Sequence, residues 1–338
     1  MKKLLPIISI LFFAGSALSQ NSPVEYMSKL SGDFDQINKD TWDYIKQVSR
    51  GKNAKKVEKR RIELVATLKT ATYNAGKVSA YKNDPTLKQA YANYLMLSYE
   101  IISNGYKNIV DMEKVAEDSY DAMEAYLLTK ERANKKLDSA YNDLKTAQHD
   151  FASKYHINLV ENDTRLSRKL ENAGEVNAYY NRLYLIFFKS SFYEGEMMKA
   201  QAEGRIGDIE QFRQTLETVS KEGIETLKKI GSFKGDYTFK VACIKAVQFF
   251  DVEASKYIPK QINFYSQKDH FDALTKNMES KKRSAITKQE VEEYNKAVAA
   301  YNNSINSFNE TNTYLNKNRT KAYNDFNEAI EDFFSKFM

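Results

Sequence analysis

The sequence contains few of the residues that cross-link or interrupt a fold. Its 338 residues include one cysteine, Cys243, with four prolines and twelve glycines. A single cysteine excludes an internal disulfide, so the fold must depend on its buried core. Because Pro and Gly are scarce, long helices are favoured. No alternation of polar and apolar residues is long enough to predict a sheet.

The residue types used for catalysis and metal binding are equally scarce. Helical bundles that bind two metal ions use Glu-x-x-His motifs, and none of His149, His156 and His270 has a Glu three residues earlier. The sequence also lacks zinc spacing, a calcium loop, a G-x-S-x-G motif and a Gly-rich phosphate loop. Cys243 lies among apolar residues and is expected to be a buried, inert thiol. We therefore expect a non-enzymatic protein with no catalytic residues, no cofactor and no metal.

The N-terminus has the three parts of a secretory signal. Lys2 and Lys3 precede an apolar run over 4–13, and small residues lead to an A-x-S site before Gln20. The apolar run is too short to cross a bilayer, which takes about 20 residues. No Cys lies near the site, so a lipoprotein is not expected. The sequence predicts a signal peptide at 1–19 and a protein exported to the periplasm, the cell surface or the medium, with no transmembrane segment in the mature chain.

The charge of the expected mature chain is small. Removing residues 1–19 leaves 49 basic and 45 acidic residues, a net charge of +4. So small an excess of positive charge argues against a nucleic-acid partner.

The C-terminal stretch from Thr287 to Met338 dominates the expected architecture. It has no Gly or Pro, and its apolar residues recur every three or four positions on one helical stripe. Thr287 and Glu290 have the spacing of a capping box, which favours a helix start at this point. The stretch predicts a helix about 75 Å long.

Two internal matches indicate a duplication. Residues 140–155 and 322–337 are identical at nine of sixteen positions, where about one is expected by chance. Residues 82–90 match 234–242 at a shift of 152, whereas the first match has a shift of 182. The difference predicts about thirty added residues in the second half, placed at Asp269–Ile286 as a short extra helix and a loop.

The predicted fold is all-α, with two tandem, duplicated units resembling antiparallel four-helix bundles. The first repeat covers 20–156, and the second, enlarged repeat covers 163–338 and ends in the long helix. In the first repeat, helices are expected over 22–50 and 53–81, from Asn83 to a weak point at 105–111, and from that point to 155. In the second repeat, helices are expected over 163–204 and 208–231, before the long C-terminal helix. Ser22 and Glu25, with Pro23 between them, form a further capping box.

Four strings resemble a family of exported bacterial α-helical surface proteins of leptospiral type. They are GKNAKKVEKRR at 51–61, SYDAMEAY at 119–126, YLIFFK at 184–189 and YNKAVAAYN at 294–302. The resemblance covers essentially the whole mature chain. It implies a secreted or surface-associated helical protein without an assigned activity. Where the family pattern has Ala-His before the first string, this chain has Ser49 and Arg50, so no role for that His carries over.

The densest charge cluster follows the expected first helix. A positive patch could bind an anionic surface, since each contact contributes on the order of 1 kcal/mol. The alternative is a solvated helix face. The candidate contacts are Arg50, Lys52, Lys55, Lys56, Lys59, Arg60 and Arg61.

An aromatic segment at Tyr179–Tyr193 either lines a pocket or lies at the centre of its bundle, and the central position is the expected one. Taken together, these features predict a surface or envelope protein that binds an unknown protein or an anionic envelope component. The alternative is a carrier that holds an apolar ligand between its helices.

Overall fold

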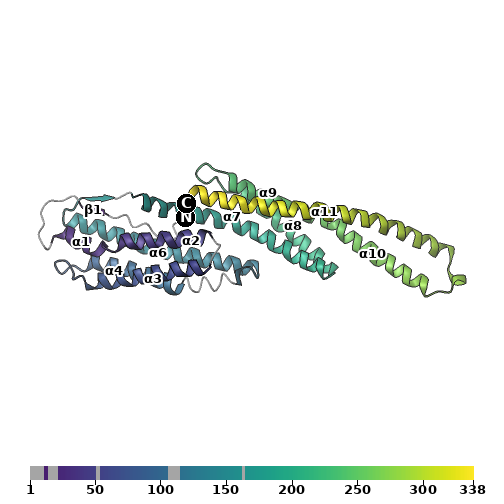
Figure 1. Ribbon diagram of the computed structural model, residues 1–338, viewed down its shortest axis with the longest axis horizontal. Coiled ribbons are helices and arrows are strands. Elements are labelled where there is room, and N and C mark those ends of the chain that lie inside the picture. Colours follow the sequence, from purple (N-terminus) through teal and green to yellow (C-terminus); the bar gives the residue numbers. More distant parts are fainter. Residues whose placement is uncertain (1–10, 14–21, 51–53, 106–114, 162–163) are drawn as a thin grey trace. The chain divides into compact units, whose positions relative to one another are not determined.

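The computed structural model describes residues 11–13, 22–50, 54–105, 115–161 and 164–338 (Figure 1). Its fold class is all-α, as predicted. Two three-residue strands, β1 (Leu11–Phe13) and β2 (Leu159–Glu161), pair antiparallel. The rest of the expected signal peptide lies outside the described residues. The chain forms two compact units, one of residues 1–181 with 334–338 and the other of 182–333. Their boundary falls inside a continuous helix, whereas the two predicted repeats end and begin at residues 156 and 163.

The first unit contains α1 (Pro23–Ser31), α2 (Phe34–Arg50), α3 (Ala54–Lys77), α4 (Thr86–Glu100), the π-helix η1 (Ile101–Gly105), α6 (Tyr120–Lys154) and the start of α7 (Arg165–Ala202). The amide of Glu25 donates to Ser22 Oγ at 3.1 Å, so the expected cap is present. The prediction of one helix over 22–50 is wrong, because a turn at Gly32 and Asp33 separates α1 from α2. The amide of Ile37 donates to the carbonyl of Asp33, and this bond begins the second helix, α2.

Aromatic side chains fill the centre of the first unit. Phe34 meets the ring of Tyr91 edge-on, with 5.4 Å between the centroids. Tyr91 and Tyr94 are almost fully buried, and Gln148 Nε2 donates to the Tyr91 hydroxyl at 2.5 Å. Burial raises the pKa of Tyr91 to about 12. These side chains join α2, α4 and α6 into one core.

The second unit contains the rest of α7, α8 (Ile206–Lys229), α9 (Thr238–Val252), the π-helix η2 (Glu253–Tyr257), α10 (Ile258–Glu279), a 3₁₀ turn at Arg283–Ala285, and α11 (Lys288–Phe337) up to residue 333. The rings of Phe187 and Phe326 stack with centroids 3.7 Å apart, which packs α7 against α11. Phe239 and Phe250 bring α9 into the same core. The long C-terminal helix is continuous over 50 residues, as predicted.

Three helices of the second unit have the same lengths as helices that lie 152 residues earlier in the first unit. Helices α3 and α8 are both 24 residues long, α4 and α9 both 15, and η1 and η2 both five. The turns before α4 and α9 also correspond, with bridges at Tyr81–Asp84 and Phe233–Asp236. In both turns a lysine has left-handed backbone, with φ of 49° at Lys82 and 50° at Lys234.

One ring contact of α6 recurs in α11 at the shift of 182. Phe151 meets Tyr81 edge-on at an interplanar angle of 72°, and Phe333 meets Phe233 at 72°. Helix α6 therefore packs on the turn before α4, and α11 packs on the turn before α9. The two sequence matches lie on corresponding helices.

The added residues include the predicted segment Asp269–Ile286 and extend beyond it on both sides. In the first unit, residues 106–119 connect η1 to α6. At the shift of 182, the start of α6 corresponds to residue 302 of α11, so the matching connection in the second unit is 258–301. The prediction of a short extra helix at Asp269–Ile286 is wrong. The extra length forms the whole of α10 and the first turns of α11. We call residues 258–308 the hairpin, and Figure 1 draws α10 beside α11 there.

Candidate functional site

The basic cluster at 50–61 is a surface patch only in part. Lys55, Lys56 and Lys59 are exposed. Arg60 is paired with Glu63 at 2.7 Å and lies 3.9 Å from Asp43. The side chain of Arg50 and residue Lys52 lie outside the described part of the chain.

Arg61 is not a surface contact, which corrects the prediction for this residue. Its exposed fraction is 8%, and Nη1 donates to the carbonyls of Ile102 at 2.9 Å and Ser103 at 3.0 Å. Glu58 accepts two further bonds from the same guanidinium. A π-helix changes the backbone bonding pattern, and its carbonyls need partners. Arg61 therefore stabilises η1.

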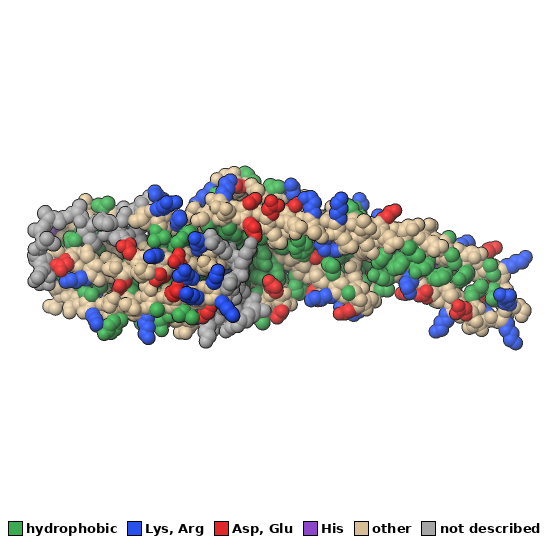
Figure 2. Space-filling model, in the orientation of Figure 1, with side chains coloured by type: hydrophobic (Ala, Val, Ile, Leu, Met, Phe, Trp, Pro, Cys, Tyr) green, Lys and Arg blue, Asp and Glu red, His purple; other side chains and the backbone are tan. Residues whose placement is uncertain are grey.

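A second basic group lies at the end of the hairpin. Residues 276–288 contain five basic side chains and one acidic side chain. Lys281 is paired with Glu290. Four others are exposed and have no carboxylate partner within the described part of the chain: Lys276, Lys282, Arg283 and Lys288. We call these four residues the basic tip. In Figure 2 the end of the hairpin carries several Lys and Arg side chains.

A ladder of aromatic rings holds the hairpin together. Phe264 stacks on Phe308 with centroids 4.3 Å apart, and Phe271 stacks on Tyr301 at 5.1 Å. Phe271 also contacts Tyr294, one step nearer the tip, at 5.8 Å. These rings remain partly exposed, because the two helices cover them from only two sides. Ring stacking thus joins α10 to α11 along the ladder.

The capping box at the start of α11 also fixes the tip. The amide of Glu290 donates to Thr287 Oγ1 at 3.2 Å, and the amide of Thr287 donates to the Glu290 carboxylate at 2.9 Å. The bond from Lys281, together with the bonds from Thr287, lowers the pKa of Glu290 to about 2. The predicted cap is confirmed, and it orders the backbone that presents the basic tip.

A buried ionic cluster lies at the opposite end of the hairpin. Arg319 on α11 donates to the carboxylates of Glu194 on α7 and Glu253 in η2. The Tyr323 hydroxyl donates to Glu194 Oε2 at 2.9 Å. The exposed fractions are 3% for Glu194 and 0% for Glu253. We call these four residues the buried cluster.

The buried cluster was not predicted, although two features of the sequence indicate it. Arg319 falls on the apolar stripe of α11, between Leu315 and Phe326, which are both buried. Glu253 follows an apolar helix at the position that corresponds to Ile101 at the shift of 152. A charged residue at an otherwise apolar position indicates a buried charge, and its partners could be found only in the fold.

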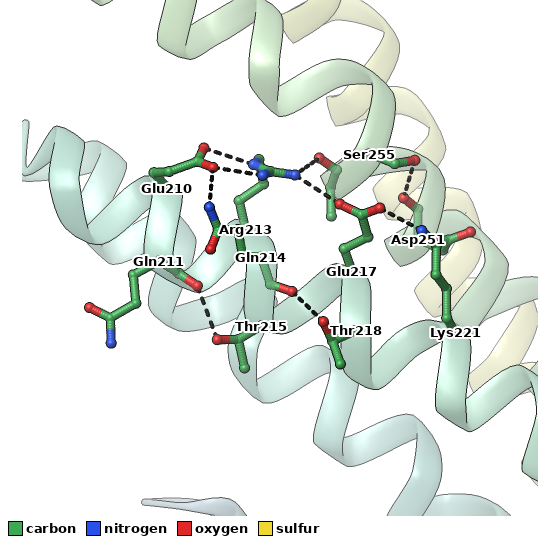
Figure 3. A network of polar contacts seen from close by, with 11 residues as sticks. Glu210, Gln211, Arg213, Gln214, Thr215, Glu217, Thr218, Lys221, Asp251 and Ser255 are labelled. Atoms are coloured by element: carbon green, nitrogen blue, oxygen red, sulfur yellow. Dashed lines mark hydrogen bonds and ion pairs between the residues drawn. The ribbon is translucent and has the colours of Figure 1, made fainter.

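A second polar network supports η2 from α8 (Figure 3). Arg213 binds Glu210 at 2.6 Å and Glu217 at 2.9 Å, and its Nη1 donates to the carbonyl of Ala254 at 3.4 Å. Lys221 binds the other oxygen of Glu217 at 2.5 Å. An arginine of α3 thus donates to a carbonyl of η1, and an arginine of α8 donates to a carbonyl of η2.

The aromatic segment and the cysteine have the structural places expected of them. Phe187 and Phe188 are buried on α7, and Tyr193 is partly buried. Cys243 is fully buried, and its Sγ lies 3.5 Å from the carbonyl oxygen of Leu183. Burial raises the pKa of this thiol far above its usual range.

Comparison of the chain with models of protein families, with curated proteins and with solved structures finds no match. Among the described residues, no helix combines the length and the apolar character needed to cross a membrane. The same residues contain no group of three or more His, Cys, Asp or Glu side chains placed to hold a metal ion.

Proposed function

We propose that the chain is a non-enzymatic, exported envelope protein that binds an anionic lipid surface through the basic tip of its hairpin. The observation that carries this proposal is the group of four exposed cations at the turn between α10 and α11. The signal-like N-terminus and the resemblance to exported helical surface proteins support the location. The lack of catalytic motifs in the sequence supports a binding role.

We further propose that the two units are copies of one four-helix plan. The equal lengths of α3 and α8, and of α4 and α9, support this origin. If the units are copies, the hairpin is a segment that was added to the second copy. Residues 258–301 take the place of the shorter 106–119, so the common fold does not require the added length. We therefore assign the binding role to this added segment.

The charge distribution favours the tip as the contact surface. Residues 276–288 carry a net charge of +4, whereas the whole chain carries +6. Each cation near an anionic bilayer contributes about 1 kcal/mol. Four cations then give about 4 kcal/mol, which corresponds to weak and reversible binding. Such binding is strongest at low ionic strength.

The test is co-sedimentation with vesicles of phosphatidylglycerol and of phosphatidylcholine. The triple variant K282Q/R283Q/K288Q removes three tip cations, and the matched variant K55Q/K56Q/K59Q removes three exposed cations of the first unit. We expect the wild type to bind anionic vesicles alone, the tip variant to bind at least tenfold more weakly, and the matched variant to bind like the wild type.

Equal binding by the tip variant and the wild type overturns the proposal. So does equal binding to the two lipids. If the matched variant alone loses binding, the contact lies at the cluster around Lys55 instead of at the tip. Raising the salt concentration should weaken wild-type binding, and salt-independent binding would contradict an electrostatic contact.

A further inference from the structure

The buried cluster has unequal charges. Two carboxylates, Glu194 and Glu253, face one guanidinium, Arg319. With all three groups ionised, the cluster holds one uncompensated negative charge away from water. Such a charge costs several kcal/mol, and a proton on one carboxylate removes it. Oε2 of Glu253 is buried and has no hydrogen-bond partner within the described part of the chain.

The first unit shows that the fold does not need these charges. The positions that correspond to Glu253 and Arg319 are Ile101 and Leu137, and both are buried. Helices α4 and α9, both 15 residues long, are thus followed by a buried apolar residue in one unit and by a buried carboxylate in the other. Buried ion pairs are often no more stabilising than apolar residues of similar size. Stability alone does not account for the cluster.

The cluster lies at the root of the hairpin. Glu253 is the first residue of η2, which continues directly into α10, and Arg319 lies on α11, the other helix of the hairpin. Beside it, Gln261 joins Gln201 at 2.6 Å and Asn312 at 2.5 Å, so uncharged bonds also connect α7, α10 and α11. Any loosening of the cluster acts on both helices of the hairpin.

The charged groups around η2 come from each helix that packs on it. Helix α7 provides Glu194, and α11 provides Arg319 with the Tyr323 hydroxyl. Helix α8 provides Arg213, which is matched by Glu210 and Glu217, and Lys221. Asp251 on α9 has one buried oxygen without a hydrogen bond in the described residues. Lys256 and Lys260 are exposed. The α8 groups are paired among themselves. Burial raises the pKa of Glu194, Glu253 and Asp251, but only Glu194 and Glu253 bind the Arg319 guanidinium, so the proton that these two share belongs to the cluster.

We propose that Glu194, Glu253 and Arg319 form a proton-operated latch. It holds η2 against α7 and α11 while the two carboxylates share a proton, and it loosens the root of the hairpin when both are ionised. The latch does not depend on what the basic tip binds.

The direction of the pH effect follows from the environment of the carboxylates. Burial, with the nearby charge of Glu194, raises the pKa of Glu253 from 4.5 to about 8, and burial also raises the pKa of Glu194. In the open state both carboxylates have ordinary pKa values. Opening therefore releases a proton between about pH 4.5 and about pH 8, and the open fraction rises with pH across this range. Acid closes the latch.

Hydrogen exchange measured by mass spectrometry on the full chain tests the latch. Protection factors corrected for intrinsic exchange are compared at about pH 5 and about pH 8 for the amides of η2 and η1. The protection of η2 should fall by up to about tenfold per pH unit. The protection of η1, which has Ile101 in the corresponding place, should not change with pH.

Variants separate the latch from a general pH effect. Glu253→Gln leaves Glu194 and Arg319 as a balanced pair, and the protection of η2 should then be independent of pH. Glu293→Gln removes an exposed carboxylate of α11 and should behave like the wild type. If E253Q does not fold, E194Q/E253I/R319L installs the apolar pair of the first unit and should give the same flat profile.

Two results would overturn the latch. One is equal pH dependence of η1 and η2 in the wild type. The other is a pH-dependent η2 in either the E253Q or the triple variant, once circular dichroism has shown that the variant is folded. A variant that loses vesicle binding but keeps the pH-dependent hydrogen exchange of η2 would identify a residue of the basic tip and would leave the latch intact.

Discussion

Arg61 and Arg213 occupy corresponding places 152 residues apart, and each donates to a carbonyl of a π-helix. Arg61 bonds to Ile102 O at 2.9 Å, and Arg213 bonds to Ala254 O at 3.4 Å. Each also binds a glutamate three residues earlier on its own helix, Glu58 or Glu210. The two π-helices are thus supported by the same device in both units.

Removing this device should destabilise the first unit. Arg61→Ala leaves two carbonyls without their charged donor, and hydrogen bonds to charged groups contribute roughly 1.5–3 kcal/mol each. We expect a loss of about 2–3 kcal/mol in the free energy of unfolding, measured by urea denaturation. Lys59→Ala, an exposed neighbour, should change it by less than about 0.5 kcal/mol. Arg61→Lys should not restore stability, because Lys lacks the forked geometry. An R61A protein as stable as K59A would contradict this role.

The start of α11 should loosen in acid. The pKa of Glu290 is lowered, so the ionised carboxylate stabilises the start of α11. This stabilisation is fully present above the ordinary carboxyl pKa of 4.5 and is lost as the pH falls towards about 2. Amide exchange at residues 287–291, corrected for intrinsic rates, should show less protection at about pH 2.5 than at about pH 6. Glu290→Gln should already be loosened at about pH 6 and should change little with pH. A wild-type segment with equal protection at both pH values would contradict the capping role.

The long helices and their caps could be predicted because they depend on local sequence. The stretch after Thr287 contains its own start signal and no breaker, and it forms one helix to Phe337. The break at Gly32 was missed because glycine can occur within a helix at modest cost, and the turn there becomes clear only from the contacts of α2. The length of the added segment was also readable, since it equals the difference between two sequence shifts.

The roles of the charged residues could not be read from the sequence. Arg61 belongs to a run of cations, and only the fold places its side chain on η1, about forty residues away along the chain. Glu194 and Arg319 are 125 residues apart. The basic tip was divided between an expected loop and an expected helix, so its four cations did not stand out as one group. Long-range pairing decides which charges are buried, and local patterns do not contain that information.

Cys243 should be unreactive in the folded protein. Its side chain is fully buried, and burial raises the pKa of the thiol, so little thiolate forms at neutral pH. A thiol-reactive disulfide reagent at about pH 8 should label the native chain only slowly and label the chain in urea at once. Fast labelling of the native protein would show that the core between α7 and α9 opens readily. Cys243→Ala gives the background for both conditions.

The aromatic ladder should decide the local stability of the hairpin. Phe308→Ala removes the ring that stacks on Phe264 at 4.3 Å. Loss of a buried Phe costs roughly 3–5 kcal/mol, and this ring is partly exposed, so we expect about 2 kcal/mol. Hydrogen exchange should show less protection over 258–308 and unchanged protection in α8 and α9. Phe192→Ala removes a half-buried ring of α7 elsewhere in the second unit and should leave the hairpin unchanged. Because the ladder orders the basic tip, F308A should also weaken binding to anionic vesicles while keeping every cation. Full vesicle binding by a protein with a loosened hairpin would mean that the four cations act without the ordered turn.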